Sequence, residues 1–129
     1  RLMSGRKFPA SVRMRIRSDI REVFSQGSYR PLGPIGAKYI RTSHQESRFL
    51  VTVKKAVGHA PFRNRIKRIL REGLRHHRDQ FSIPHDVCLM VTRTPKFPLK
   101  FGYVSGLIRQ LAEDLNPQPN RVKPSLQNA

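Results

Sequence analysis

Hydrophobic positions follow two different spacings along this chain, and the spacings predict its helices and strands. Near the start, Ile20, Val23 and Phe24 fall on one side of a helix that would run from residue 18 to about residue 26. Ser18 can cap its first turn and Gly27 can end it. The pattern therefore predicts a short amphipathic helix there.

Strand spacing dominates the next part of the chain. Residues 37–43 and 47–53 are rich in β-branched and aromatic residues, and we expect them to form two strands of a hairpin that turns near residues 44–46. Prolines and glycines between residues 30 and 36 indicate a loop before them. Residues 86–92 are apolar on both faces after the first position, which is typical of an inner strand.

Helical spacing returns in two longer segments. The longest predicted helix covers residue 61 to about residue 80, with Pro61 tolerated in its first turn. A second apolar series recurs from about residue 104 to residue 115 and ends before Pro117. Together the elements predict a single domain of helices and strands at residues 18–116, between a basic N-terminal arm at residues 1–17 and a flexible tail at residues 117–129.

The longest predicted helix separates its apolar and charged residues. With Ile66 at zero and about 100° per residue, an apolar stripe lies within about 80° of it: Phe62, Ile69, Leu70, Gly73, Leu74 and His77. The side away from Ile66 carries Asn64, Lys67, Arg68, Arg71, Arg75 and Arg78. Guanidinium groups in such a row suit phosphate oxygens. A purely solvated basic face is the alternative.

The composition also points to a partner that carries phosphate groups. The 129 residues include 26 Lys and Arg against 8 Asp and Glu, a formal net charge of +18. Nucleic acid is the first polyanion to consider, and an anionic membrane surface is the second. No apolar run approaches the roughly 20 residues of a spanning helix, and no signal-peptide pattern is present. We therefore expect a cytoplasmic protein without a membrane partner.

The sequence contains no recognisable catalytic constellation. The acids are scattered, so a protein-built two-metal site is not expected, and no glycine-rich phosphate loop follows a strand. His76 and His77 are adjacent on a helix and point in different directions. The single cysteine, Cys88, excludes an internal disulfide and is expected to be a small buried hydrophobe. These features favour a binding protein over an enzyme with its own active site.

Aromatic residues provide a second candidate surface. Phe24, Tyr39 and Phe49 each have a plain interpretation as core residues. Taken together with nearby basic residues, they can instead stack on unpaired bases; those basic residues are Arg17, Arg41 and Arg48.

The segment VGHAPFRNRIKRILREGLR, residues 57–75, resembles the signature helix of the bacterial ribonuclease P protein component. The likeness extends over most of residues 13–115. The resemblance implies an α+β sandwich with a small mixed sheet of about four strands, three main helices and a left-handed crossover, although most crossovers are right-handed. It also implies a function, namely assisting a catalytic RNA subunit in the Mg²⁺-dependent removal of the 5′ leader of precursor tRNA.

The same resemblance suggests which residues serve each role. It implies contacts to the RNA subunit from the signature helix, at Arg63, Asn64, Arg65, Lys67, Arg68 and Arg71. Arg75 on the charged face of that helix, Lys54 and Lys55 before it, and Arg17 at the start of the chain's first helix are further candidates for RNA contacts. The resemblance also implies that a cleft between the first helix and the sheet receives the single-stranded leader, at Phe24 and Tyr39, and Arg48 is a further candidate there.

The resemblance also carries expectations about cofactor and assembly. Mg²⁺ would belong to the RNA subunit, and the protein would be a monomer in the holoenzyme. Two other classes share some of these features. A ribosomal protein would have the same size and charge but a structural role on rRNA. A helix-turn-helix DNA binder is disfavoured by the strand content.

Overall fold

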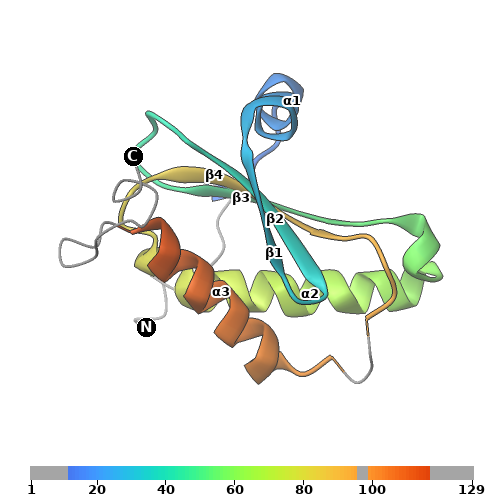
Figure 1. Cartoon of the computed structure of the whole chain (residues 1–129). Coiled ribbons are helices and arrows are strands. Elements are labelled where there is room, and N and C mark those ends of the chain that lie inside the picture. The colour runs from blue at the N-terminus through green and yellow to red at the C-terminus, as the bar shows by residue number, and fades with distance from the viewer. Residues whose placement is uncertain (1–11, 96–98, 117–129) are drawn as a thin grey trace, which may run out of the picture.

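The computed structural model describes residues 12–95 and 99–116, which form a mixed four-stranded sheet with helices on both faces (Figure 1). The strands are β1 (Ser28–Leu32), β2 (Ile35–Arg41), β3 (Arg48–Val53) and β4 (His85–Val91). Their order across the sheet is β1-β2-β4-β3. β2 is antiparallel to β1 and to β4, whereas β3 and β4 are parallel.

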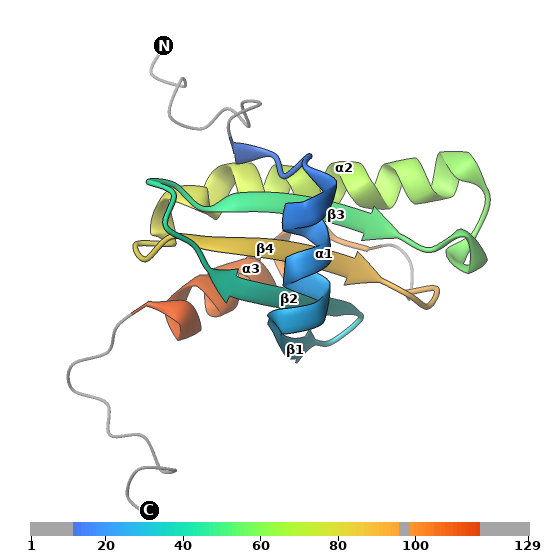
Figure 2. The ribbon, with the colours of Figure 1, turned by 90° about the horizontal axis from the view of Figure 1, so that it is seen from above.

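Three helices cover the sheet unequally. α1 (Arg17–Gln26) lies alone on one face, while α2 (Ala60–His77) and α3 (Phe101–Leu115) pack together on the other (Figures 1 and 2). Two short 3₁₀ turns, η3 (Lys55–Val57) and η4 (Arg78–Gln80), flank α2. The path from β3 through α2 to its parallel neighbour β4 is left-handed (Figure 2), so the expected fold class is confirmed, including the uncommon crossover.

The main core lies between the sheet and the pair of helices α2 and α3. The predicted stripe of α2 supplies Ile66, Leu70 and Leu74, all fully buried, and Gly73 lets α3 approach closely: a Cβ there would lie 2.5 Å from Ile108 Cδ1. Strand alternation supplies the opposite wall of this core, with these sheet residues buried: Phe49, Val51, Val53, Val87, Leu89 and Val91.

A smaller cluster fills the space beneath α1. Met14, Val23 and Cys88 are buried there, and Ile20, Ile40, Leu50 and Met90 pack around them. The expectation that Cys88 is a buried hydrophobe is confirmed, and burial raises the pKa of its thiol to about 12. The thiol is therefore protonated at neutral pH.

The predicted hairpin of residues 37–43 and 47–53 is wrong. Both strands exist, but β4 lies between β2 and β3, so they are not neighbours. The hairpin partner of β2 is β1, within a segment that the sequence pattern indicated to be a loop. β1 carries Pro31, which lacks an N–H group and is tolerated because β1 is an edge strand. Gly33, with φ of 63°, forms the tight turn between the two strands.

The N-terminal boundary also differs from the prediction. Residues 1–11 of the expected arm, like the expected tail at 117–129, lie outside the described residues. Val12 and Met14, however, are buried, and the Met14 N–H donates to the Phe49 carbonyl at 2.9 Å. α1 begins at Arg17 with Ile16 in the capping position, not at Ser18. The folded domain therefore begins at residue 12 or earlier.

Candidate nucleic-acid interface

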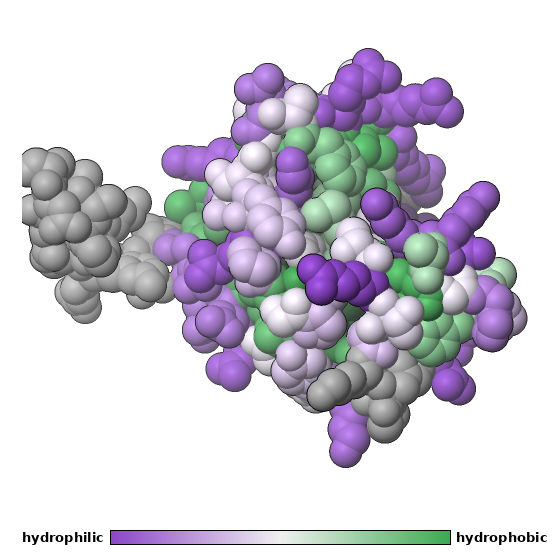
Figure 3. Space-filling view, turned by 45° about the vertical axis from the view of Figure 1, so that its right-hand side comes forward, coloured by the Kyte–Doolittle hydropathy of each residue, from purple (hydrophilic) through white to green (hydrophobic). Residues whose placement is uncertain are grey.

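Hydrophilic side chains project from much of the face drawn in Figure 3, with hydrophobic areas between them. Among the described residues, no helix is long and apolar enough to cross a membrane. Two parts of this surface combine the residue types that nucleic acids bind: the outer face of α2, and the sheet face that carries α1.

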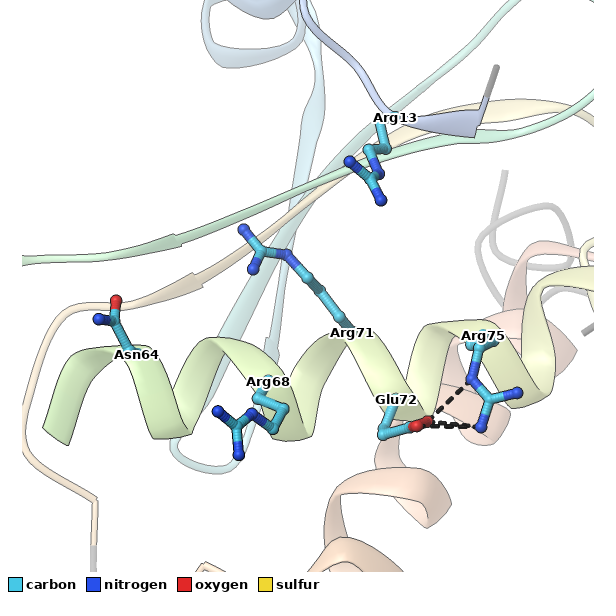
Figure 4. Close-up of a pocket in the computed structure, with 6 residues that line it drawn as sticks. All are labelled: Arg13, Asn64, Arg68, Arg71, Glu72 and Arg75. Carbon is cyan, nitrogen blue, oxygen red and sulfur yellow. Dashed lines mark hydrogen bonds and ion pairs between the residues drawn. The ribbon is translucent and has the colours of Figure 1, made fainter. Parts of the chain in front are cut away.

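The outer face of α2 forms one wall of a basic groove. Asn64, Arg68, Arg71 and Arg75 follow one another at helical spacing and line a hollow of about 440 Å³ (Figure 4). Across the hollow, Arg13 projects from the segment beside β3, and its guanidinium group and that of Arg71 both extend into the space between this segment and α2. The groove thus has cationic groups on both walls, which suits a phosphate backbone passing between them.

Arg13 was missed by the sequence analysis. It reaches the groove because a single parallel bridge to Phe49 holds its segment at the edge of β3. The alternation of apolar Val12 and Met14 with Arg13 and Arg15 was a signal for an extended edge segment, but it was too short to separate from a mobile arm.

The predicted RNA-binding residues of α2 do not all have the same environment. Arg65 and Arg68 are exposed, and Lys67 is half-buried. Arg63 donates from Nε to the Gly58 carbonyl at 2.8 Å, so it also ties the start of α2 to the preceding turn. Arg75 is paired with Glu72, with 2.6 Å between Nη2 and Oε1. Glu72 therefore offsets part of the charge at the C-terminal end of the groove.

The remaining predicted RNA contacts lie at other edges of the domain. Lys54 and Lys55 are exposed where β3 leads into η3, and the Lys54 N–H donates to the Val91 carbonyl at 3.0 Å. Arg17 is exposed at the first position of α1. The structure does not bring these three residues into the hollow that Asn64, Arg68 and Arg71 line.

The second surface is the sheet face beside α1. Phe24, near the end of α1, is 36% exposed, and its carbonyl accepts a hydrogen bond of 2.7 Å from Lys38 Nζ of β2. Lys38 pairs in register with Tyr29 of β1, which is 56% exposed and whose ring lies against Gly36. Tyr29 also borders a hollow of about 380 Å³ together with Arg93. Two aromatic rings and a lysine amine therefore follow one another on this face.

Tyr39 lies on the opposite face of the sheet from α1. It packs against the main core and makes an edge-on contact with the His85 ring, with 6.0 Å between ring centroids. Phe24 and Tyr39 cannot line one cleft beside α1 in this arrangement. The sequence analysis missed Tyr29, because only the pairing of β1 with β2 reveals which face each tyrosine occupies.

Arg48, predicted to contact the leader, is held inside the protein. Its Nε and Nη2 atoms donate to the two carboxylate oxygens of Asp86 at 2.9 and 2.7 Å, and its Nη1 donates to Asp19 of α1 at 3.1 Å. The hydrogen bond to Asp86 raises the pKa of Arg48 above its ordinary value. The Arg48 side chain thus already has two carboxylate partners.

The described residues do not build a metal site of their own. Within residues 12–95 and 99–116, no three His, Cys, Asp or Glu side chains lie together in a way that could hold a metal ion. The two acids that do converge, Asp19 and Asp86, share the Arg48 guanidinium group. This donor set suits an ion pair and does not suit Mg²⁺, which prefers several oxygen ligands.

The chain is similar to known proteins over most of its length. Residues 8–112 match the family model described as Ribonuclease P. A relative named ribonuclease P protein component, from Dictyoglomus thermophilum, is 38% identical over 71 residues, which cover 55% of this chain and 59% of that relative. A protein of the same name from Dictyoglomus turgidum is 32% identical over 88 residues, covering 68% of this chain and 72% of the relative. The match thus spans less than two thirds of the first relative and more than two thirds of the second.

A solved structure shows the same fold. The RNase P protein from Thermotoga maritima superimposes with a TM-score of 0.69 at 21% sequence identity, over 81% of this chain and 98% of that one. At this level of identity the similarity concerns the arrangement of the sheet and helices.

Proposed function

This chain belongs to the ribonuclease P protein family, and from that membership we propose that it is the protein subunit of a ribonuclease P ribonucleoprotein. In this proposal an RNA subunit performs the cleavage, and the protein binds both that RNA and the 5′ leader of precursor tRNA. Family membership favours this role over a structural role on rRNA.

The observation that carries the proposal is the groove between α2 and Arg13. Arg68 and Arg71 line the hollow from α2; Arg71 extends toward the side on which Arg13 lies, and Arg13 presents its guanidinium group from the opposite wall (Figure 4). Phosphates placed between them would be neutralised from both sides, and release of their counterions would favour binding. We assign this groove to the RNA subunit.

The leader is assigned to the other face of the molecule. Phe24 and Tyr29 expose ring surface beside α1, and base stacking on such rings is tolerant of sequence. Lys38 stands between them, and Arg93 borders the adjoining hollow, so positive charge is available for the phosphates. The two surfaces lie on different faces of the domain, which would allow one protein to contact both RNAs at once.

Mg²⁺ enters this proposal at the RNA subunit. The ion would supply the Lewis acid and the activated water of phosphodiester hydrolysis, as in other metal-dependent nucleases. The role of the polypeptide is then binding and positioning.

Reconstitution tests the proposal. The purified protein is mixed with a ribonuclease P RNA and precursor tRNA in Mg²⁺, and the position of cleavage is mapped. We expect accurate removal of the 5′ leader that becomes faster as protein is added, and no cleavage by the protein without the RNA subunit. Accurate Mg²⁺-dependent cleavage by RNA-free protein, or a protein without effect on the RNA, would overturn the proposal.

A further inference from the structure

α1 is attached to the rest of the domain through few apolar contacts. Of its ten residues, all of which the structure describes, Val23 alone is buried. The cluster beneath it is small, with Met14 and Cys88 as the other buried members. α2, by contrast, buries three large side chains in the main core, Ile66, Leu70 and Leu74. The orientation of α1 on the sheet must therefore depend strongly on its polar contacts.

Those polar contacts occur at the two ends of the helix. Near the C-terminal end, Lys38 Nζ holds the Phe24 carbonyl at 2.7 Å. Near the N-terminal end, Asp19 binds Arg48 of β3, and Arg48 is itself fixed by a two-pronged pair with Asp86 of β4. α1 is thus held to β2 at one end and to β3 and β4 at the other, with Val23 between. We call the contact of Asp19 with Arg48 the N-terminal tether and the contact of Lys38 with the Phe24 carbonyl the C-terminal tether.

The burial of the N-terminal tether decides whether Arg48 can bind RNA directly. Its side chain is 12% exposed and that of Asp86 is 7% exposed, whereas Asp19 is 29% exposed. A phosphate that bound Arg48 would have to replace a bidentate carboxylate in a poorly solvated position, leaving Asp86 buried without its cation. Arg48 is therefore suited to holding α1 and poorly suited to direct RNA contact.

We propose that Arg48 is a positioning residue, which through Asp19 fixes α1 at the angle that presents Phe24 to the leader of the bound precursor. This inference rests on the proposed function of the surface beside α1. Without the Asp19 contact, α1 would stay held at Val23 and at the Phe24 carbonyl, so it could rotate about that end. The Phe24 ring projects from this pivot, and displacements of about 1 Å are costly where a site must match its ligand.

Replacing Asp19 with Asn distinguishes positioning from direct contact by the sign of the effect. If Arg48 touches leader phosphates directly, Asp19→Asn removes a competing negative charge and strengthens precursor binding. If Arg48 acts by holding α1, the same change loosens the helix and weakens precursor binding. Asp19→Asn also leaves the buried pair of Arg48 and Asp86 intact, so the fold is expected to survive.

The matched control is Glu22→Gln. Glu22 is one turn further along α1 and exposed, and its replacement removes the same negative charge without touching Arg48. The measurement is the ratio of holoenzyme affinities for precursor tRNA and mature tRNA, with amide hydrogen exchange of the free protein as a second readout. In Asp19→Asn we expect the ratio to fall by about fivefold or more, the equivalent of one lost base stack. Exchange should quicken in α1 and stay unchanged in α2.

The outcomes separate the inference from the proposed function. An increased ratio in Asp19→Asn, or a ratio equal to that of Glu22→Gln, overturns the positioning role while leaving the leader site in place. A fallen ratio together with unchanged α1 exchange also overturns it, because the helix would not have been released. A wild-type holoenzyme that binds precursor and mature tRNA equally would contradict the leader site itself, and the positioning role with it.

Discussion

The outer face of α2 and the sheet face beside α1 use arginine in opposite ways. On α2, Arg68 and Arg71 project from a well-anchored helix into an open groove. Beside α1, Arg48 is nearly buried between two carboxylates, and the exposed groups are aromatic rings. The difference shows that an arginine of this protein either presents its charge to solvent or holds two elements together, and that burial and the nearest acid decide which.

Stability measurements should show the largest contrast between the two faces. Arg48→Gln leaves Asp86 buried without its partner, and breaking such a pair costs about 3 to 5 kcal/mol of unfolding free energy. Arg68→Gln changes an exposed residue, so its effect should stay within about 0.5 kcal/mol. Urea denaturation of both variants measures the difference. Equal stabilities would mean that the Arg48 network contributes little to the fold.

Aromatic truncations should separate the two faces of the sheet. Phe24→Ala and Tyr29→Ala should each weaken precursor binding by about 1 to 3 kcal/mol, with mature tRNA binding nearly unchanged. Tyr39→Ala should lower thermal stability and leave the preference for precursor intact, since Tyr39 packs on the core. A lost leader preference in Tyr39→Ala, with the other two variants unaffected, would reverse the assignment of the faces.

A smaller effect is expected from pH. Burial lowers the pKa of His85 below its ordinary value of 6.5, although its Nδ1 contact with the Ile83 carbonyl acts in the other direction. At a pH between the folded and unfolded pKa values of His85, this side chain is therefore protonated in the unfolded chain and mostly neutral in the folded protein. Stability should be highest above about pH 7 and should decrease as the pH falls below the unfolded value of about 6.5, levelling off below the folded pKa.

His85→Gln removes this titration, and the exposed His44→Gln serves as the comparison. Thermal unfolding of both variants from pH 8 to pH 5 is the measurement. A decrease in stability of the same size in His85→Gln as in the wild type would assign the pH dependence to other groups.

Features contained within one element could be predicted from the sequence. The charged face and core stripe of α2 follow from helical spacing over a long segment, and Ile66, Leu70 and Leu74 are buried as predicted. β4 and α3 were likewise correct, because a doubly apolar strand and a long apolar series have few other interpretations.

Features that depend on contacts between distant segments could not be predicted. The sequence pattern of β2 and β3 does not show that β4, more than 30 residues later, inserts between them. Arg48 meets its partners Asp19 and Asp86 at separations of 29 and 38 residues. The same limit applies to Arg13 and Tyr29. Arg13 is placed by its bridge to Phe49 at the edge of β3, and Tyr29 is placed by the pairing of β1 with β2.

The salt dependence of RNA binding tests the role of the α2 groove most directly. Affinity for the ribonuclease P RNA subunit is measured over a salt series for the wild type, Arg68→Gln, Arg71→Gln and the exposed α3 control Arg109→Gln. Each lost phosphate contact should flatten the plot of log affinity against log salt by about 0.7 to 0.9 in the two groove variants, and the control should keep the wild-type slope. Equal slopes for all four proteins would mean that Arg68 and Arg71 are merely solvated and that the RNA subunit binds elsewhere.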